Sequence, residues 1–299
     1  MIDVTNVSKS FDDLEALKDI ALLVNKGSIY GLVGSNGAGK TTLLKIIAGI
    51  YKENEGVVEI NSFPVFENTD IKARIVFIPD TPFYFNNYSI ENLAVYYQRI
   101  YPKWNYNRYL LLKDVFNIDP KRRIKTLSRG MQRQVAFWMG FSIMPEVMIL
   151  DEPMDGLDPV MRQKVKRLIV QDVAERDMTV IISSHNLREL EDICDHIGIL
   201  HQGRLLIQQD LDDLKADVHK IQIAFAEGIP SALYGDMQVL HYEEKGSVLT
   251  MIIRGSYEDI VQSIDNYHPA IIDVLPLTLE EIFIYEMGEN DYEIQNIFN

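Results

Sequence analysis

The first two thirds of the chain alternate between short apolar segments and segments with helical spacing. Runs rich in β-branched residues predict strands at Ile2–Val7, Ile20–Val24, Ile29–Val33, Val147–Leu150 and Thr179–Ile182. Apolar positions three and four apart predict helices over Thr41–Tyr51 and Val160–Glu175 and, between residues 88 and 140, near Ile90–Arg99, near Arg108–Phe116 and from Ser128 onward. Strands that alternate with helices favour an α/β fold with a mostly parallel sheet. The helical block at about 88–140 is then an inserted subdomain.

The last part of the chain has a different pattern. It predicts strands at Ile221–Ala226, Gln238–Tyr242, Val248–Ile253 and Ile271–Leu275, and helices at Tyr257–Ile264 and Leu279–Met287. Residues 216–299 carry three basic and 15 acidic side chains, whereas residues 1–215 carry 26 and 29. This step in charge predicts a domain boundary near residue 216. We therefore expect a domain at 1–215 followed by a small acidic α+β domain at 216–299.

The composition excludes or disfavours several classes of protein. The 299 residues are 47% hydrophobic and contain one cysteine, which excludes a disulfide scaffold and is typical of a reducing compartment. The longest strongly apolar run, Val135–Met144, is too short for a membrane span, and the N-terminus does not have the pattern of a signal peptide. The formal charge of −15 disfavours a nucleic-acid partner.

A glycine-rich segment between a predicted strand and a predicted helix fits the phosphate-loop pattern G-x-x-x-x-G-K-[ST]. Glycines let backbone N–H groups turn toward a phosphate, and the helix that follows adds its positive end. In this pattern the lysine contacts the β- and γ-phosphates and the threonine hydroxyl contacts Mg²⁺. The candidate ATP-binding residues are Gly34, Ser35, Asn36, Gly37, Ala38, Gly39, Lys40, Thr41 and Thr42.

Two carboxylates follow the buried strand Val147–Leu150. Ligands of α/β proteins bind at the carboxyl ends of such strands. Asp151 is a candidate Mg²⁺ ligand together with Thr41, and Glu152 is a candidate general base that activates water. The phosphate loop and this acidic pair together predict a P-loop ATPase or GTPase.

Three further segments narrow the class. Leu127-Ser128-Arg129-Gly130 begins a predicted helix, Gly156-Leu157-Asp158-Pro159 follows the acidic pair, and Ser183-Ser184-His185 follows a later strand. In this order, with the phosphate loop and the acidic pair, they resemble the motifs of ABC transporter ATP-binding subunits. The five motifs cover residues 34–185, and the cassette pattern extends over about 1–215.

The resemblance implies roles for particular residues. In this family two cassettes meet head to tail, and each ATP lies between the phosphate loop of one and the LS-x-G helix of the other. Ser128 and Gly130 would therefore contact ATP held by the partner, and Asp158 would lie at the interface between cassettes. Glu152 would be the general base and His185 would contact the γ-phosphate. Phe11 matches the aromatic residue that stacks on adenine.

Two departures from the family pattern stand out. Asp80 occupies the position where the family usually has glutamine, and it could contact Mg²⁺ directly or through water, but it lacks an N–H donor. The coupling role of that position is therefore in question in this chain. Arg129 and Met131 also depart from the commonest signature, and the LS-x-G-M form is familiar in cassettes of export-type permeases.

Two clusters of residues leave alternatives open. The aromatic residues of Thr81–Tyr88 either pack against the helical block or line an apolar groove for a permease coupling helix. A run of basic residues is either a solvated surface or a contact for lipid headgroups or a permease loop. That run comprises Lys121, Arg122, Arg123, Lys125, Arg129 and Arg133.

The variant motifs FIPD, LSRGMQRQVAFW and DEPMDGLDPVMR, with SSHNLRELEDICDHIGIL, most resemble the Ytr-type subunits of Gram-positive bacteria, which are associated with acetoin utilisation and cell-envelope stress. The resemblance implies an ATPase that binds ATP and Mg²⁺, pairs with a second cassette, and drives separate membrane permease subunits, with export favoured. We expect it at the cytoplasmic face of the membrane. The alternatives are a soluble ABC-type ATPase that acts on ribosomes or DNA, and a nucleotide-gated regulator.

Overall fold

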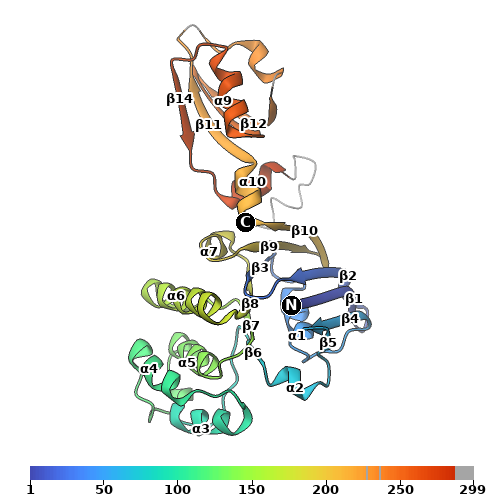
Figure 1. Ribbon diagram of the computed structural model, residues 1–299, viewed down its shortest axis with the longest axis vertical. Helices are drawn as coiled ribbons and strands as arrows, with labels where there is room; N and C mark the ends of the chain where they lie inside the picture. Colours follow the sequence, from blue (N-terminus) through green and yellow to red (C-terminus); the bar gives the residue numbers. More distant parts are fainter. Residues whose placement is uncertain (227, 236, 287–299) are drawn as a thin grey trace. The chain divides into compact units, whose positions relative to one another are not determined.

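The chain forms two compact units in a computed structural model, Met1–Gln208 and Gln209–Asn299 (Figure 1). The structure describes residues 1–226, 228–235 and 237–286. The step in charge near residue 216 falls inside the second unit. The end of the last predicted helix, Met287, lies outside the described residues, as does the rest of the chain after it.

The first unit is built on a six-stranded sheet with the order β10-β9-β3-β8-β7-β6. The strands from β9 to β6 pair in parallel. The buried strands β3 (Ile29–Val33), β7 (Val147–Asp151) and β8 (Thr179–Ser184) lie in its centre. Helices cover both faces of such sheets, which explains why these strands are almost continuously apolar. The outer strands are β6 (Ile75–Ile78), β9 (His196–His201) and β10 (Arg204–Asp210). The predicted parallel sheet is confirmed.

A second, antiparallel sheet has the order β2-β1-β4-β5 and was not predicted as a separate layer. Its strands are β1 (Ile2–Phe11), β2 (Leu14–Val24), β4 (Glu55–Ile60) and β5 (Phe63–Pro64). In β1 the buried Ile2 and Val4 alternate with exposed residues, because only one face of this sheet packs on the core. The apolar pattern predicted individual strands but did not indicate which strands pair in which sheet.

Helix α1 (Lys40–Ile47) packs between the two sheets through Leu43, Leu44, Ile46 and Ile47 (Figure 1). It ends four residues before the predicted Tyr51. The chain leaves the helix through Gly49, which has a φ of 65°, a conformation that glycine adopts without steric cost. The two sheets thus share one apolar core with α1 at its centre.

The helical block forms as predicted. It contains α3 (Ile90–Ile100), α4 (Tyr106–Phe116), the 3₁₀ turn η1 (Ile124–Thr126) and α5 (Arg129–Ser142). Ser89, Asn105 and Ser128 each accept a hydrogen bond from the first turn of the helix that they precede. The short helices α2 (Thr69–Lys72) and α7 (Leu187–Glu191) and the long α6 (Pro159–Arg176) complete the unit. Figure 1 shows α5 and α6 on the side of the parallel sheet opposite α1.

The second unit contains a four-stranded antiparallel sheet with the order β12-β13-β11-β14. Its strands are β11 (Val218–Ala224), β12 (Gln238–Lys245), β13 (Val248–Arg254) and β14 (Ile271–Leu275). Its helices are α8 (Leu211–Ala216), η2 (Ser231–Gly235), α9 (Tyr257–Asp265) and α10 (Leu279–Glu286). The order is that of a split β-α-β arrangement, in which η2 takes the place of the first helix.

Across residues 1–226, 228–235 and 237–286, no helix combines the length and the apolar character that a bilayer crossing requires.

Candidate functional site

The loop between β3 and α1 forms a curled backbone cradle. Gly34 is packed so closely that a Cβ would lie 2.3 Å from the carbonyl oxygen of Leu200, and Gly39 has a φ of 109°. Since no side chain caps α1, the N–H groups of its first turn are available to an anion. The predicted phosphate loop thus has the geometry that its glycines require.

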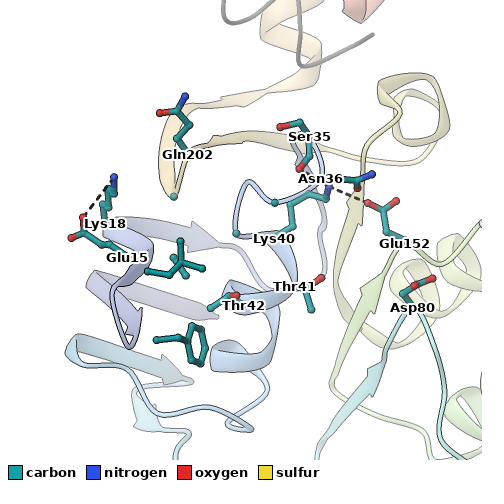
Figure 2. A pocket seen from close by; sticks show the side chains of 16 residues that line it. Glu15, Lys18, Ser35, Asn36, Lys40, Thr41, Thr42, Asp80, Glu152 and Gln202 are labelled. Atoms are coloured by element: carbon teal, nitrogen blue, oxygen red, sulfur yellow. Dashed lines mark hydrogen bonds and ion pairs between the residues drawn. The ribbon is translucent and has the colours of Figure 1, made fainter.

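Lys40 is the buried cation of this loop. Its side chain is 6% exposed, and its Nζ donates to the carbonyl oxygen of Gly34 at 2.5 Å. Nζ also lies 3.1 Å from Oε1 of Glu152, the ion pair drawn in Figure 2. A buried ammonium group requires such partners, and a phosphate oxygen could replace one of them. The predicted lysine and the predicted general base therefore meet in one place.

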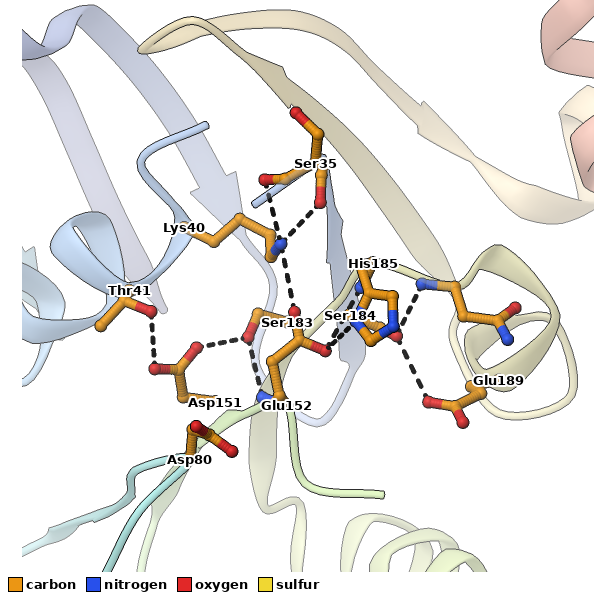
Figure 3. Close-up of polar contacts among 12 residues, drawn as sticks. Ser35, Lys40, Thr41, Asp80, Asp151, Glu152, Ser183, Ser184, His185 and Glu189 are labelled. Carbon is orange, nitrogen blue, oxygen red and sulfur yellow. Dashed lines mark hydrogen bonds and ion pairs between the residues drawn. The ribbon is translucent and has the colours of Figure 1, made fainter. Parts of the chain in front are cut away.

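Asp151 links the phosphate loop to the carboxyl end of the sheet. Its Oδ2 accepts a hydrogen bond from Thr41 Oγ1 at 2.8 Å, and its Oδ1 accepts one from Ser183 Oγ at 2.7 Å (Figure 3). The carboxylate is almost fully buried, so both oxygens need these donors. A hydroxyl and a carboxylate in contact form a pair of hard oxygen ligands of the kind that Mg²⁺ prefers.

Glu152 connects Lys40 with His185. Its Oε2 lies 2.9 Å from Nδ1 of His185 and 3.3 Å from the backbone nitrogen of the same residue (Figure 3). Glu152 has a φ of 45°, which is uncommon for a residue with a Cβ and is frequent at functional sites. The imidazole is half exposed. The predicted base and the predicted switch histidine are thus in direct contact.

Lys40, Thr41 and Glu152 line a cavity of about 580 Å³ next to the phosphate loop, whereas Asp151 and His185 contact these residues from outside its lining. Among the predicted site residues it is lined by Phe11, Ser35, Asn36, Gly37, Gly39, Lys40, Thr41, Thr42, Asp80 and Glu152 (Figure 2). Phe11 is 38% exposed and makes an edge-to-face contact with Tyr51. A partly exposed ring that lines this cavity is suited to stack on a flat heterocycle.

Six lining residues were missed by the sequence analysis. They are Leu14, Glu15, Ala16, Lys18, Gln202 and Gly203. The first four lie in the turn-proximal part of strand β2, and the last two form the β9–β10 turn. The two segments lie side by side, and Lys18 N donates to the carbonyl oxygen of Gly203 at 2.8 Å. Nothing in the sequence indicated that the turn residues Gln202 and Gly203 meet the phosphate loop, because the two segments are far apart in the chain.

The LS-x-G segment lies outside this cavity. Ser128 caps α5 by accepting from the N–H of Met131, and Asp158 caps α6 by accepting from the N–H of Met161. A Cβ on Gly130 would lie 2.4 Å from the carbonyl oxygen of Gly156, so the two predicted loops touch through their backbones. Neither Ser128, Gly130 nor Asp158 lines the cavity at Lys40.

One member of the basic run is not a surface residue. The side chain of Arg133 is 8% exposed and pairs with Oδ1 of Asp80 at 2.8 Å. The interpretation of the run as a solvated face or a lipid contact is therefore wrong for Arg133, because α5 turns this side chain inward. The other five members are exposed.

The fold and the site define a P-loop nucleotide-binding protein, with a phosphate cradle, a buried lysine and two carboxylates at the end of a parallel sheet. The sequence profile of the ABC transporter family matches residues 17–155. The chain is 34% identical to the ABC transporter ATP-binding protein YtrB of Bacillus subtilis, and the match spans 96% of this chain and 98% of that protein. The chain therefore belongs to the ABC transporter ATP-binding family, and the predicted Ytr-type resemblance is confirmed.

Two further similarities each cover 72% of this chain. The bacitracin transport ATP-binding protein BcrA of Bacillus licheniformis is 34% identical over 72% of this chain and 71% of its own length. A solved structure described as the ATP binding subunit of an ABC transporter superposes with a TM-score of 0.67 at 26% identity, over 72% of this chain and 92% of that one. The predicted ABC cassette fold is confirmed.

Proposed function

We propose that this chain is the ATP-hydrolysing motor subunit of an ABC transporter of the export type, held at the cytoplasmic face of a membrane by separate permease subunits. One observation carries the proposal. A single cavity brings together a buried lysine, a carboxylate that contacts that lysine, and a threonine bonded to a second carboxylate.

These residues fit Mg·ATP by their chemistry. The N–H groups of the phosphate loop and Lys40 would bind the β- and γ-phosphates, and Phe11 would stack on the adenine. Thr41 and Asp151 would hold Mg²⁺, and Asp80, which lines the same cavity as Thr41, would take part directly or through water. Bound there, Mg²⁺ would neutralise charge on the phosphate oxygens. Hydrogen-bonded oxygens of a hydroxyl and a carboxylate are suitable ligands for that ion.

Glu152 and His185 would carry the hydrolysis. Glu152 accepts a proton from water, the water oxygen attacks the γ-phosphorus, and ADP leaves as the bond to its β-phosphate oxygen breaks. His185 touches the same carboxylate and would orient the γ-phosphate. Lys40 lies 3.1 Å from Glu152. Its ammonium group would therefore stabilise the negative charge on the γ-phosphate oxygens while water attacks beside Glu152.

The position of the LS-x-G segment supports action on a partner's nucleotide. Ser128 and Gly130 begin an exposed helix end that does not line the chain's own phosphate cavity. In a head-to-tail dimer the same helix end would close the partner's ATP site, and Asp158 would lie at the interface. Whether the partner cassette is a second copy or a different chain is decided by co-purification.

An apolar groove supports a permease partner. A cavity of about 390 Å³ lies between the parallel sheet and the helical block, and its walls are mostly apolar and aromatic. Phe83, one of the lining residues, is 83% exposed, and its ring makes an edge-to-face contact with Phe85. The open prediction for Thr81–Tyr88 is therefore divided: Tyr84 is buried and packs inward, while Phe83 and Phe85 remain available to a helix of the permease.

The enzymatic part of the proposal is tested by steady-state hydrolysis of ATP. The wild-type chain should release phosphate, and Glu152→Gln should lower turnover by at least about a hundredfold while retaining affinity for a fluorescent ATP analogue. Lys40→Ala should lose affinity itself. Unchanged turnover in Glu152→Gln would remove Glu152 as the base.

The transport part is tested by co-purification. Tagged Glu152→Gln protein is recovered from detergent-solubilised native membranes with ATP present, and the bound proteins are identified by mass spectrometry. A multi-span membrane protein supports the motor role, and a second cassette shows a heterodimer. Ribosomes or DNA without an integral membrane protein would instead support the soluble ATPase alternative.

A further inference from the structure

Asp80 adds a third carboxylate to a site that must accept a polyphosphate. It follows β6 at the carboxyl end of the sheet, beside the end of β7 that carries Asp151 and Glu152 (Figure 3). Its side chain is 56% exposed and lines both the cavity at Lys40 and a second cavity of about 400 Å³ at the start of α5. An uncompensated carboxylate at this place would repel the γ-phosphate of ATP.

Arg133 compensates that charge from within the fold. Its Nη2 donates to Oδ1 of Asp80 at 2.8 Å and to the backbone oxygen of the same residue. Its Nη1 donates to the backbone oxygen of Glu152. One guanidinium group therefore joins the loop after β6, the loop after β7 and the helix α5.

The chemistry of this contact is specific to arginine. A guanidinium group is planar and presents several N–H donors in fixed directions, so it can serve two backbone oxygens and a carboxylate at once. A lysine could supply the charge at this position but could not hold both loops. Because the side chain is nearly buried, the cation also depends on Asp80 as its counter-ion.

Arg133 contacts Glu152, the proposed base, at its backbone carbonyl oxygen and not at its side chain. Glu152 adopts a φ of 45°, and its carboxylate must meet both Lys40 and His185. A donor fixed on the carbonyl of Glu152 helps to hold the backbone in that uncommon conformation. Arg133 thus affects two properties of the site: the net charge that Asp80 places near the phosphates, and the orientation of the Glu152 side chain.

We propose that Arg133 is a positioning residue of the ATP site with two roles. It neutralises the charge of Asp80, so that this carboxylate does not repel the phosphates of ATP, and it holds the Glu152 loop in the conformation needed for hydrolysis. This inference rests on the proposed function. It assigns the two effects to different features of one side chain: its charge governs affinity for ATP, and its fork of donors governs turnover.

The first experiment measures equilibrium binding of a fluorescent ATP analogue in EDTA, where a role of Asp80 at the metal cannot contribute. Arg133→Gln should raise the Kd about tenfold, because Asp80 is left uncompensated. Asp80→Asn combined with Arg133→Gln should return the Kd to within about threefold of wild type. Asp80→Asn alone should bind at least as tightly as wild type, because it removes a negative charge from the site and leaves Arg133 cationic.

The second experiment measures hydrolysis of Mg·ATP by Arg133→Lys. The lysine keeps the charge, so KM should stay within about threefold of wild type, whereas kcat should fall about tenfold because the contact to Glu152 is lost. Arg167→Lys makes the same exchange at an exposed position on α6 and is the matched control, with wild-type binding and turnover expected. Thermal unfolding of every variant shows whether it is folded.

Three outcomes would overturn the inference while wild type still binds and hydrolyses ATP. They are wild-type affinity in folded Arg133→Gln, failure of Asp80→Asn to restore binding in that background, and a change of kcat in Arg133→Lys no larger than that in Arg167→Lys. Wild-type protein that neither binds nor hydrolyses ATP would refute the proposed function instead.

Discussion

The side chains of the site are held by partners that come from distant parts of the sequence. Thr41 and Asp151 are 110 residues apart in sequence, and Asp151 and Ser183 are 32 apart. Each buried polar atom in this group has a donor or acceptor close by, which is the condition for placing charges inside a fold. Preorganised groups of this kind need little rearrangement when charge develops during hydrolysis.

Cys194, by contrast, is a buried packing residue outside the candidate site. It is buried, and a Cβ on Gly31 would lie 3.0 Å from its Sγ. Burial raises the pKa of the Cys194 thiol well above its ordinary value, with a further increase from Asp195. We expect the native protein to react with a thiol reagent at pH 8 at least a hundredfold more slowly than the unfolded protein in guanidinium chloride. Equal rates in the two states would contradict this packing.

At the scale of elements, local capping and the burial of one face determine where helices begin. Helix α10 begins with a reciprocal pair: the N–H of Glu281 donates to Thr278 Oγ1, and the N–H of Thr278 donates to Glu281 Oε2. This arrangement is a capping box. Lys220 of β11 adds an ion pair to the same carboxylate at 2.6 Å, so the helix start is tied to the sheet of the second unit.

The capping box gives a prediction for stability. Thr278→Ala should lower the free energy of unfolding of the second unit by about 1 kcal/mol, because it leaves the Glu281 N–H without its acceptor. Urea unfolding followed by the fluorescence of the tyrosines in this unit measures the effect. Thr250→Ala, at a half-buried position of β13 outside the box, serves as the comparison. Equal losses in the two variants would show that the box contributes nothing specific.

The charge of Glu281 adds a dependence on pH. Partial burial acts to raise the pKa of this carboxyl, but hydrogen bonds from Lys220 and Thr278 outweigh it and the pKa is lowered. A lowered native pKa stabilises the fold above the ordinary pKa of glutamate, and this stabilisation is lost as the pH falls through the native value. The destabilisation by Glu281→Gln should therefore be larger at pH 7 than at pH 3.5. Denaturant titrations at both values measure it, and a pH-independent difference would contradict the assignment.

At the scale of the whole molecule, the arrangement predicts a nucleotide-dependent dimer. The LS-x-G helix end and the phosphate cavity are separate surfaces of one cassette, so two chains are needed to bring them together. When both chains are identical and related by a two-fold axis, such a contact is self-complementary, because each helix end meets the phosphate cavity of the other chain.

Light scattering after gel filtration tests the dimer. Glu152→Gln with ATP should elute as a dimer and without ATP as a monomer, because bound nucleotide completes the interface. Adding Ser128→Arg should abolish the dimer while leaving the affinity of the monomer for ATP within about threefold. Loss of ATP affinity in the monomer would place Ser128 in the chain's own site. A monomer in Glu152→Gln with ATP would instead point to a different chain as partner.

The sequence by itself determined the class of site and most of the elements. The phosphate loop and the acidic pair are contiguous segments whose function lies in local backbone geometry, so Gly34–Thr42 and Asp151–Glu152 were recognisable without a fold. The helices of the 88–140 block and the strands after residue 216 were predicted from periodicity for the same reason. The ends of some elements were displaced, as in α1, which ends at Ile47 before the turn at Gly49 and not at the predicted Tyr51.

Only the tertiary structure decided which distant groups meet. The separate antiparallel sheet, the turn at Gln202 and Gly203 beside the phosphate loop, and the pairing of Arg133 with Asp80 all depend on contacts between segments far apart in the chain. Arg133 shows the physical reason most clearly. A basic residue in a basic run has the same sequence pattern whether it faces water or is buried against a carboxylate, and its environment follows from how α5 packs against the loops after β6 and β7.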